Sequence, residues 1–129
     1  MTTNTNMTVY NQYTDPTTKN VVFKKHLIDY VMWDDSLGVN LNQGYENADK
    51  VNVYIPKDKN DISQYKKPKE YNGTGWTLQN GDIIVKGNVN IDQVTGVKDL
   101  KNYDVFRITV MDDKDFGSKC MHHFEIRGN

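Results

Sequence analysis

The sequence has little of what a disulfide framework, a membrane span or a basic nucleic-acid-binding protein needs. One cysteine, Cys120, stands in 129 residues, which excludes an internal disulfide and is typical of a reducing compartment. No run approaches the roughly 18 apolar residues of a membrane-spanning helix, and residues 1–8 lack the basic and apolar regions of a signal peptide. A net charge of −1 gives no general attraction to nucleic acid. These shortages predict synthesis in the cytoplasm and no membrane contact.

Strong helix formers are also scarce. Leu and Ala together number six and Glu three, whereas Val and Ile number 21, Asp 14 and Asn 15. β-Branched side chains suit a half-buried pleated surface, and Asp and Asn favour turns over helix interiors. The composition therefore predicts a mainly β protein with a single globular domain.

Alternating apolar residues and turn residues place the strands. We expect strands over residues 21–33, 50–56, 82–86, 105–111 and 122–127, with a shorter one over 39–45. The strand over 21–33 has no cleanly polar face, so it should bulge near Lys25 or Asp29. In the strand over 105–111, Phe106, Ile108 and Val110 should point inward. Strands of this number and length indicate a small β-barrel or sandwich.

The connecting segments complete the predicted domain. Residues 1–20 are polar, with a turn at 14–17, and are expected to form an N-terminal arm, while residues 21–129 form the β domain. Asn80-Gly81 predicts a two-residue hairpin turn after a strand at 76–78. One short helix is expected over 95–102, with Thr95 as its N-cap.

A long loop over residues 57–75 is the candidate contact site. Loops longer than about 12 to 15 residues are usually functional or disordered. This loop carries five lysines against Asp58, Asp61 and Glu70, so its local charge is +2. The candidate contact residues are Lys57, Lys59, Lys66, Lys67 and Lys69. The loop suits an acidic partner or nucleic acid, and a solvated loop is the alternative interpretation.

No pattern predicts catalysis, a metal or a cofactor. On a strand, His122 and His123 point to opposite faces, and Cys120 with His122 would make only half of a tetrahedral zinc site, which His26 or an Asp would have to complete. The run Asp112–Gly117 lacks the spacing of a calcium-binding loop. We therefore expect a binding or assembly protein and not an enzyme.

Several blocks, in order and spacing, resemble a known group of proteins. The most specific are Gly81-Asp82-Ile83-Ile84-Val85-Lys86-Gly87 and Asp115-Phe116-Gly117-Ser118, and the likeness runs from Thr8 to Gly128. They are similar to a family of small uncharacterised proteins of tailed phages and prophages of Firmicutes. The chain departs from that family's pattern at Lys119-Cys120, where Pro or Asn is commoner, and this weakens any role for Cys120.

The resemblance implies a structural virion protein of the head–tail connector, or neck, because genes of this family lie between capsid and tail genes. It favours the stopper, or head-completion protein, a small β-barrel that assembles as a homo-oligomeric ring between the adaptor and portal side of the head and the tail. A tail terminator or other tail-completion protein is one alternative, and a non-virion β-type binding module is another. In such a ring, the loop lysines would face packaged DNA in the channel or contact a neighbouring subunit.

Overall fold

The computed structural model describes residues 3–34, 50–91, 94, 96–100, 103–115, 117 and 121–129. Six strands account for most of the regular structure: β1 (Thr5–Thr14), β2 (Val21–Asp34), β3 (Val51–Pro56), β4 (Ile83–Lys86), β5 (Val105–Lys114) and β6 (His123–Gly128). Two short 3-10 helices, η3 (Pro68–Glu70) and η4 (Val97–Leu100), lie between strands in this part of the chain. The prediction of a mainly β protein is confirmed.

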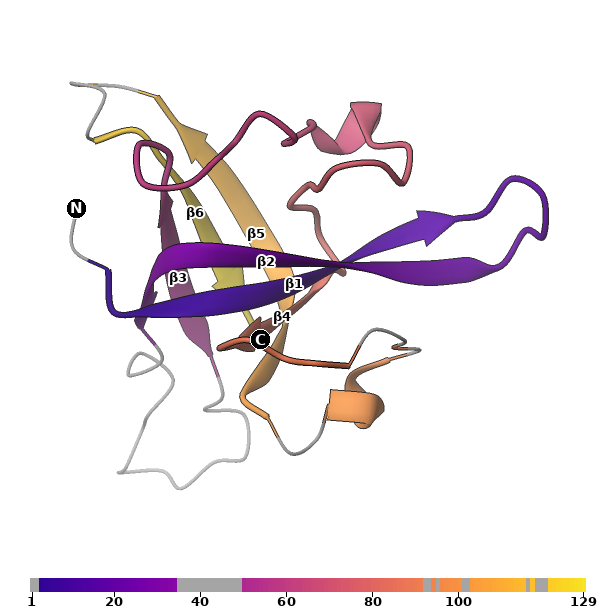
Figure 1. Cartoon of the computed structure of the whole chain (residues 1–129). Helices are drawn as coiled ribbons and strands as arrows, with labels where there is room; N and C mark the ends of the chain where they lie inside the picture. The colour runs from indigo at the N-terminus through magenta and orange to yellow at the C-terminus, as the bar shows by residue number, and fades with distance from the viewer. Residues whose placement is uncertain are drawn as a thin grey trace.

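The six strands form one antiparallel sheet that closes into a ring. The strand order is β1-β2-β3-β6-β5-β4, and β4 pairs back onto β1 (Figure 1). β3 confirms the predicted alternation, since Val51, Val53 and Ile55 are buried while the residues between them are half-buried. Closure leaves a single interior for the apolar faces of all six strands.

β1 corrects the prediction of an N-terminal arm. Residues 5–14 are a full strand that pairs with β2 along its length and with β4 over Met7–Tyr10. Met7, Val9 and Tyr10 are completely buried. The segment looked like an arm because Thr, Asn and Gln separate its few apolar residues, but partners distant in the sequence satisfy those polar side chains. Thr8, for example, donates its hydroxyl to the carbonyl of Gly87 at 2.8 Å.

β2 carries the bulge that its sequence predicted. Its register against β1 shifts between the pairs Met7–Ile28 and Thr5–Val31, so Asp29 and Tyr30 lie opposite the single residue Asn6. Both bulged residues are exposed. The bulge therefore keeps the Asp29 carboxylate out of the interior, as expected.

A second bulge corrects the predicted orientation of Val110 in β5. The register against β6 shifts between the pairs Ile108–Gly128 and Val110–Arg127, which makes Thr109 the extra residue. Ile108 is buried as predicted, but Val110 is 42% exposed, and Met111 packs against the core instead. The inserted residue reverses the alternation beyond it.

Two apolar clusters lie on opposite sides of β4. Ile84 belongs to the interior cluster with Met7, Val9 and Phe124, whereas Ile83 and Val85 pack outside the ring against Val89, Val94 and Leu100. The segment that follows β4 covers this outer face (Figure 1). This explains why the predicted central strand is apolar on both faces.

Two further predictions are modified by the structure. The turn at Asn80-Gly81 forms, with the Asp82 N–H donating to the Gln79 carbonyl at 3.2 Å and Gly81 at a φ of +91°, but no hairpin results because β4 pairs with β1 and β5. In the described part of the expected helix over 95–102, the structure has the 3-10 helix η4 over Val97–Leu100. The expected strand over 39–45 and the N-cap Thr95 lie outside the described residues.

The bulge at Thr109 predicts unequal effects of two neighbouring substitutions. Ile108→Ala should lower the free energy of unfolding by about 2–5 kcal/mol, because it removes a buried side chain from the closed interior. Val110→Ala should change it by no more than about 0.5 kcal/mol, because Val110 faces solvent. Urea unfolding followed by circular dichroism measures both, and a larger effect at Val110 would contradict the observed register.

Candidate functional site

The loop over residues 57–75, predicted as a loop and found as one, is fastened to the closed sheet by an aromatic anchor. The Tyr65 ring lies 4.5 Å from the Phe124 ring and 5.0 Å from the Trp76 ring, measured between centroids. The backbone fixes the same point, since the Lys66 N–H donates to the Trp76 carbonyl at 2.8 Å and the Trp76 N–H to the Gln64 carbonyl at 3.1 Å. Gly75 is required there, because its φ is +78° and a Cβ would collide with the Gln64 carbonyl oxygen.

Asn60 fastens the first part of the loop to the bulge of β2. Its side-chain oxygen accepts the Tyr30 N–H at 3.1 Å, and its Nδ2 donates to the carbonyls of Tyr30 at 2.8 Å and Pro56 at 2.9 Å. A bulge leaves backbone groups without a strand partner. Asn60 supplies that partner, so loop and bulge form one unit.

Lys57 differs from the other predicted contact lysines. Its Nζ forms ion pairs with Asp113, at 2.5 Å, and with Asp115, and lies 4.6 Å from the centre of the Phe124 ring. Burial alone would lower the pKa of Lys57, but hydrogen bonds to the two carboxylates outweigh it and raise the pKa. Lys57 therefore joins the start of the loop to the end of β5 and does not offer a free charge to a partner.

The remaining four lysines keep their charge available. Lys59, Lys67 and Lys69 are exposed and Lys66 is half-buried. Lys67 and Lys69 line an open groove of about 660 Å³ together with Tyr65, Pro68, Glu70, Met111 and Asp113. The structure thus gathers two of the five predicted residues at one groove.

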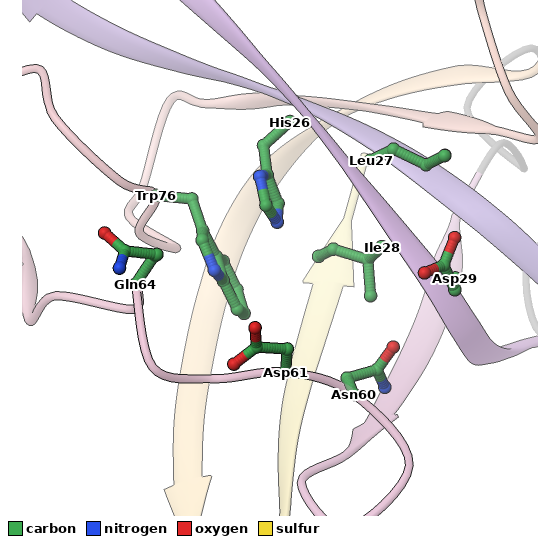
Figure 2. Close-up of a pocket in the computed structure, with 8 residues that line it drawn as sticks. All are labelled: His26, Leu27, Ile28, Asp29, Asn60, Asp61, Gln64 and Trp76. Carbon is green, nitrogen blue, oxygen red and sulfur yellow. The ribbon is translucent and has the colours of Figure 1, made fainter.

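A smaller pocket lies under the loop, between β2 and the anchor (Figure 2). Its volume is about 150 Å³, below the roughly 300–1,000 Å³ of most small-molecule sites. It fits a few water molecules or one inserted side chain. The lining residues are His26, Leu27, Ile28, Asp29, Asn60, Asp61, Gln64 and Trp76.

His26 is the titratable centre of this pocket. Its ring stacks on Trp76 with centroids 5.0 Å apart and planes 8° from parallel, and Asp61 approaches from the loop (Figure 2). Burial lowers the pKa of His26, and the nearby carboxylates of Asp29 and Asp61 offset part of that effect. The stacked position therefore favours the neutral imidazole, and the carboxylates of Asp29 and Asp61 would attract a proton bound there.

The histidines near the C-terminal end of the sequence have separate neighbours. His122 Nδ1 lies 3.7 Å from an Asp115 oxygen, and the His123 ring lies 5.9 Å from the Tyr54 ring, between centroids. Cys120 lies outside the described residues. In the described ranges, no three side chains of His, Cys, Asp or Glu gather as a metal site would require, and no helix is long and apolar enough to cross a membrane.

Sequence reasoning missed Asn60 and the pair formed by His26 and Trp76. Asn60 reaches Tyr30 across 30 residues, and 50 positions separate His26 from Trp76, so no local pattern could reveal either contact. Tyr65 did give a signal, because it is one of only two aromatic residues in the polar stretch over 57–75. Such a residue indicates a point where a loop is anchored.

The fastening by Asn60 predicts a measurable loss of stability. Asn60→Ala removes three hydrogen bonds and should lower the free energy of unfolding by about 1–2 kcal/mol. Amide exchange at Tyr30 should also accelerate, because its N–H loses its acceptor. Asn72→Ala is the matched control in the same loop, since among the described residues its side chain accepts only the nearby Thr74 N–H. Equal effects of the two variants would contradict the fastening.

The environment of His26 predicts a pH dependence of stability. Its pKa in the folded chain lies below the usual 6.5, so the unfolded chain binds more protons and stability decreases as pH falls through about 6.5. His26→Phe keeps a flat ring on Trp76 and should remove this part of the decrease. Unfolding curves between about pH 7.5 and pH 5 test it. A pH profile that is unchanged in His26→Phe would refute the assignment to His26.

Comparison with known proteins adds a family and no function. No curated protein and no solved structure matches this chain. The model of one family, described as a family of unknown function (DUF6751), matches residues 1–129. The chain therefore belongs to the family of unknown function DUF6751.

Proposed function

We propose that the chain is a structural subunit of the head–tail connector of a tailed phage, and specifically a stopper, or head-completion, ring subunit. The observation that carries the proposal is a six-stranded sheet that closes on itself and holds a long, lysine-bearing loop in a fixed place. A closed sheet of this size suits the small β-barrel of the proposed subunit class, and it provides a rigid body that can repeat around a ring.

The loop over residues 57–75 is the part of the subunit that we expect to contact DNA. The aromatic anchor and Asn60 hold it against the sheet, while Lys59, Lys66, Lys67 and Lys69 have no ion pair within the described part of the chain. Fixed, unpaired lysines attract phosphate without reading sequence. In a neck ring, such a collar would retain the end of the packaged DNA until the tail joins.

Two alternatives differ from this proposal in particular features. A tail terminator would be an α+β protein. The described residues contain only two short 3-10 helices beside six strands, and this mainly β content favours the stopper. A non-virion binding module is supported by the open groove at Lys67 and Lys69. Recovery of the chain from purified virions separates both virion roles from the last.

Reversing the four unpaired lysines tests the collar. The set is Lys59→Glu, Lys66→Glu, Lys67→Glu and Lys69→Glu, in a phage that encodes this chain. Point substitutions are preferable to deletion of the loop, because deletion would also remove Tyr65 and Asn60. We expect filled heads that leak DNA or lack tails. When assembled protein binds DNA, removal of one lysine–phosphate pair should make the slope of log affinity against log salt shallower by about 0.9.

The matched control reverses two exposed lysines outside the loop, Lys50→Glu and Lys86→Glu. It should leave heads and titre near wild type. Normal titre with all four loop lysines reversed would reject the collar, and absence of the chain from virions would reject the connector role itself.

A further inference from the structure

The β1–β2 hairpin extends beyond the closed sheet. β1 pairs with β4 only over Met7–Tyr10, and β2 pairs with β3 only over Met32–Asp34. Beyond those ranges the two strands pair only with each other, although Tyr13 still contacts Tyr71 and Phe23 still packs against the outer apolar cluster. The end of this ribbon projects from the rest of the molecule (Figure 1). A two-stranded ribbon is marginal in water without further contacts, and its outer edges offer unpaired backbone groups to another chain.

The end of this ribbon, residues 14–25, is defined here as the hairpin tip. Val21 lies there and is 58% exposed, which is more than any other large apolar side chain of the described residues. Lys19, Lys24 and Lys25 against Asp15 give the tip a charge of +2. An exposed apolar residue among lysines favours a partner surface that is acidic and partly apolar.

The opposite side of the molecule has that character. The acidic end is defined here as residues 57–59 and 112–115 together with Glu125. It contains five carboxylates and three lysines, so its net charge is −2. It borders an open groove of about 330 Å³ lined by Lys57, Asp58, Ile62, Asp115 and His122, where Ile62 is 36% exposed. The end of β5 and the hairpin tip lie at opposite sides of the molecule (Figure 1), so they cannot meet within one chain.

We propose that the hairpin tip of one copy docks on the acidic end of the next copy, with Val21 against Ile62 and the lysines of the tip against Asp58 and Asp112. The contact is heterologous, because the two surfaces differ, and repetition of such a contact closes a ring when its rotation allows. It deepens the proposed function, on which it rests for the ring, by naming the surfaces that join the subunits.

Charge decides between this arrangement and a symmetric dimer. Two hairpin tips placed against each other would bring +2 against +2, and two acidic ends would bring −2 against −2. Like charges across an interface cost free energy and suppress that pairing. The head-to-tail contact brings opposite charges together at every junction.

A charge-swap experiment tests the contact. One variant carries Lys19→Glu and Lys24→Glu, the second carries Asp58→Lys and Asp112→Lys, and the third carries all four substitutions. Sedimentation velocity and native mass spectrometry of the full chain measure assembly. Each two-site variant should lose oligomer at concentrations where the wild type assembles. An equimolar mixture of the two should regain assembly with alternating subunits, because each hairpin tip then faces an end of opposite charge. The four-site variant should regain assembly, because the charges are again opposite.

Folding and location serve as independent measurements. Circular dichroism confirms that each variant keeps its β structure, and Lys50→Glu with Lys86→Glu controls for charge reversal as such. A photo-crosslinking residue at Val21 should attach to residues 57–62 or 112–115 of another copy. A wild-type chain that stays monomeric at every attainable concentration, assembly unaffected by both two-site variants, or crosslinks elsewhere would overturn the proposal.

The outcomes also separate this contact from the connector role. Rings that obey the charge swap but never occur in virions would support the contact and reject the proposed function. Virions that contain the chain, but with the hairpin tip away from the acidic end of the next copy, would support the proposed function and reject the contact.

Discussion

The pairing of β1 with β4 is the contact on which the rest of the structure depends. Only four residue pairs make it, from Met7–Lys86 to Tyr10–Ile83, yet it turns an open sheet into a ring. Buried polar contacts stand at its end: Asp82 accepts the Asn11 Nδ2 at 2.7 Å and the Gln12 N–H at 2.9 Å. Burial raises the pKa of Asp82, and those hydrogen bonds favour its charged form. Without this junction, Met7 and Val9 would lose one wall of their interior.

Two bulges then adapt the ring to its attachments. The bulge at Asp29–Tyr30 presents backbone groups that Asn60 of the long loop captures. The bulge at Thr109 turns Met111 toward the core and leaves Val110 outside. Each inserted residue thus decides which side chains meet the loop and the groove. The candidate contact surfaces follow from irregularities in the strands as much as from the strands themselves.

The sequence predicts what depends on near neighbours in the chain. Alternation identifies β3 and β6, and the charge of Asp29 foretells a bulge in β2. Prediction fails where the partner is distant in the sequence. β1 looks like a polar arm because Asp82, the hydrogen-bond partner of Asn11, lies 71 residues further along the chain. The same holds at the site, where Lys57 looks available until β5 brings Asp113 beside it across 56 residues. The direction of Val110 fails for another reason, since a single inserted residue leaves no mark in the pattern.

The distance along the chain between paired strands also governs how this protein folds. Partners in β1 and β4 are separated by 73 to 79 residues, counted from Tyr10–Ile83 and Met7–Lys86. Those in β3 and β6 are separated by 67 to 77, counted from Pro56–His123 and Val51–Gly128. To form such a pair, the chain must first lose the entropy of closing a long loop, and only then do favourable contacts form. Proteins dominated by distant β pairings therefore fold in milliseconds to seconds. The β1–β2 and β5–β6 hairpins can form early from local contacts, because their nearest partners are 7 and 9 residues apart, counted from Thr14–Val21 and Lys114–His123. The hairpin that projects from the finished ring is therefore one of two elements from which folding of the chain can begin.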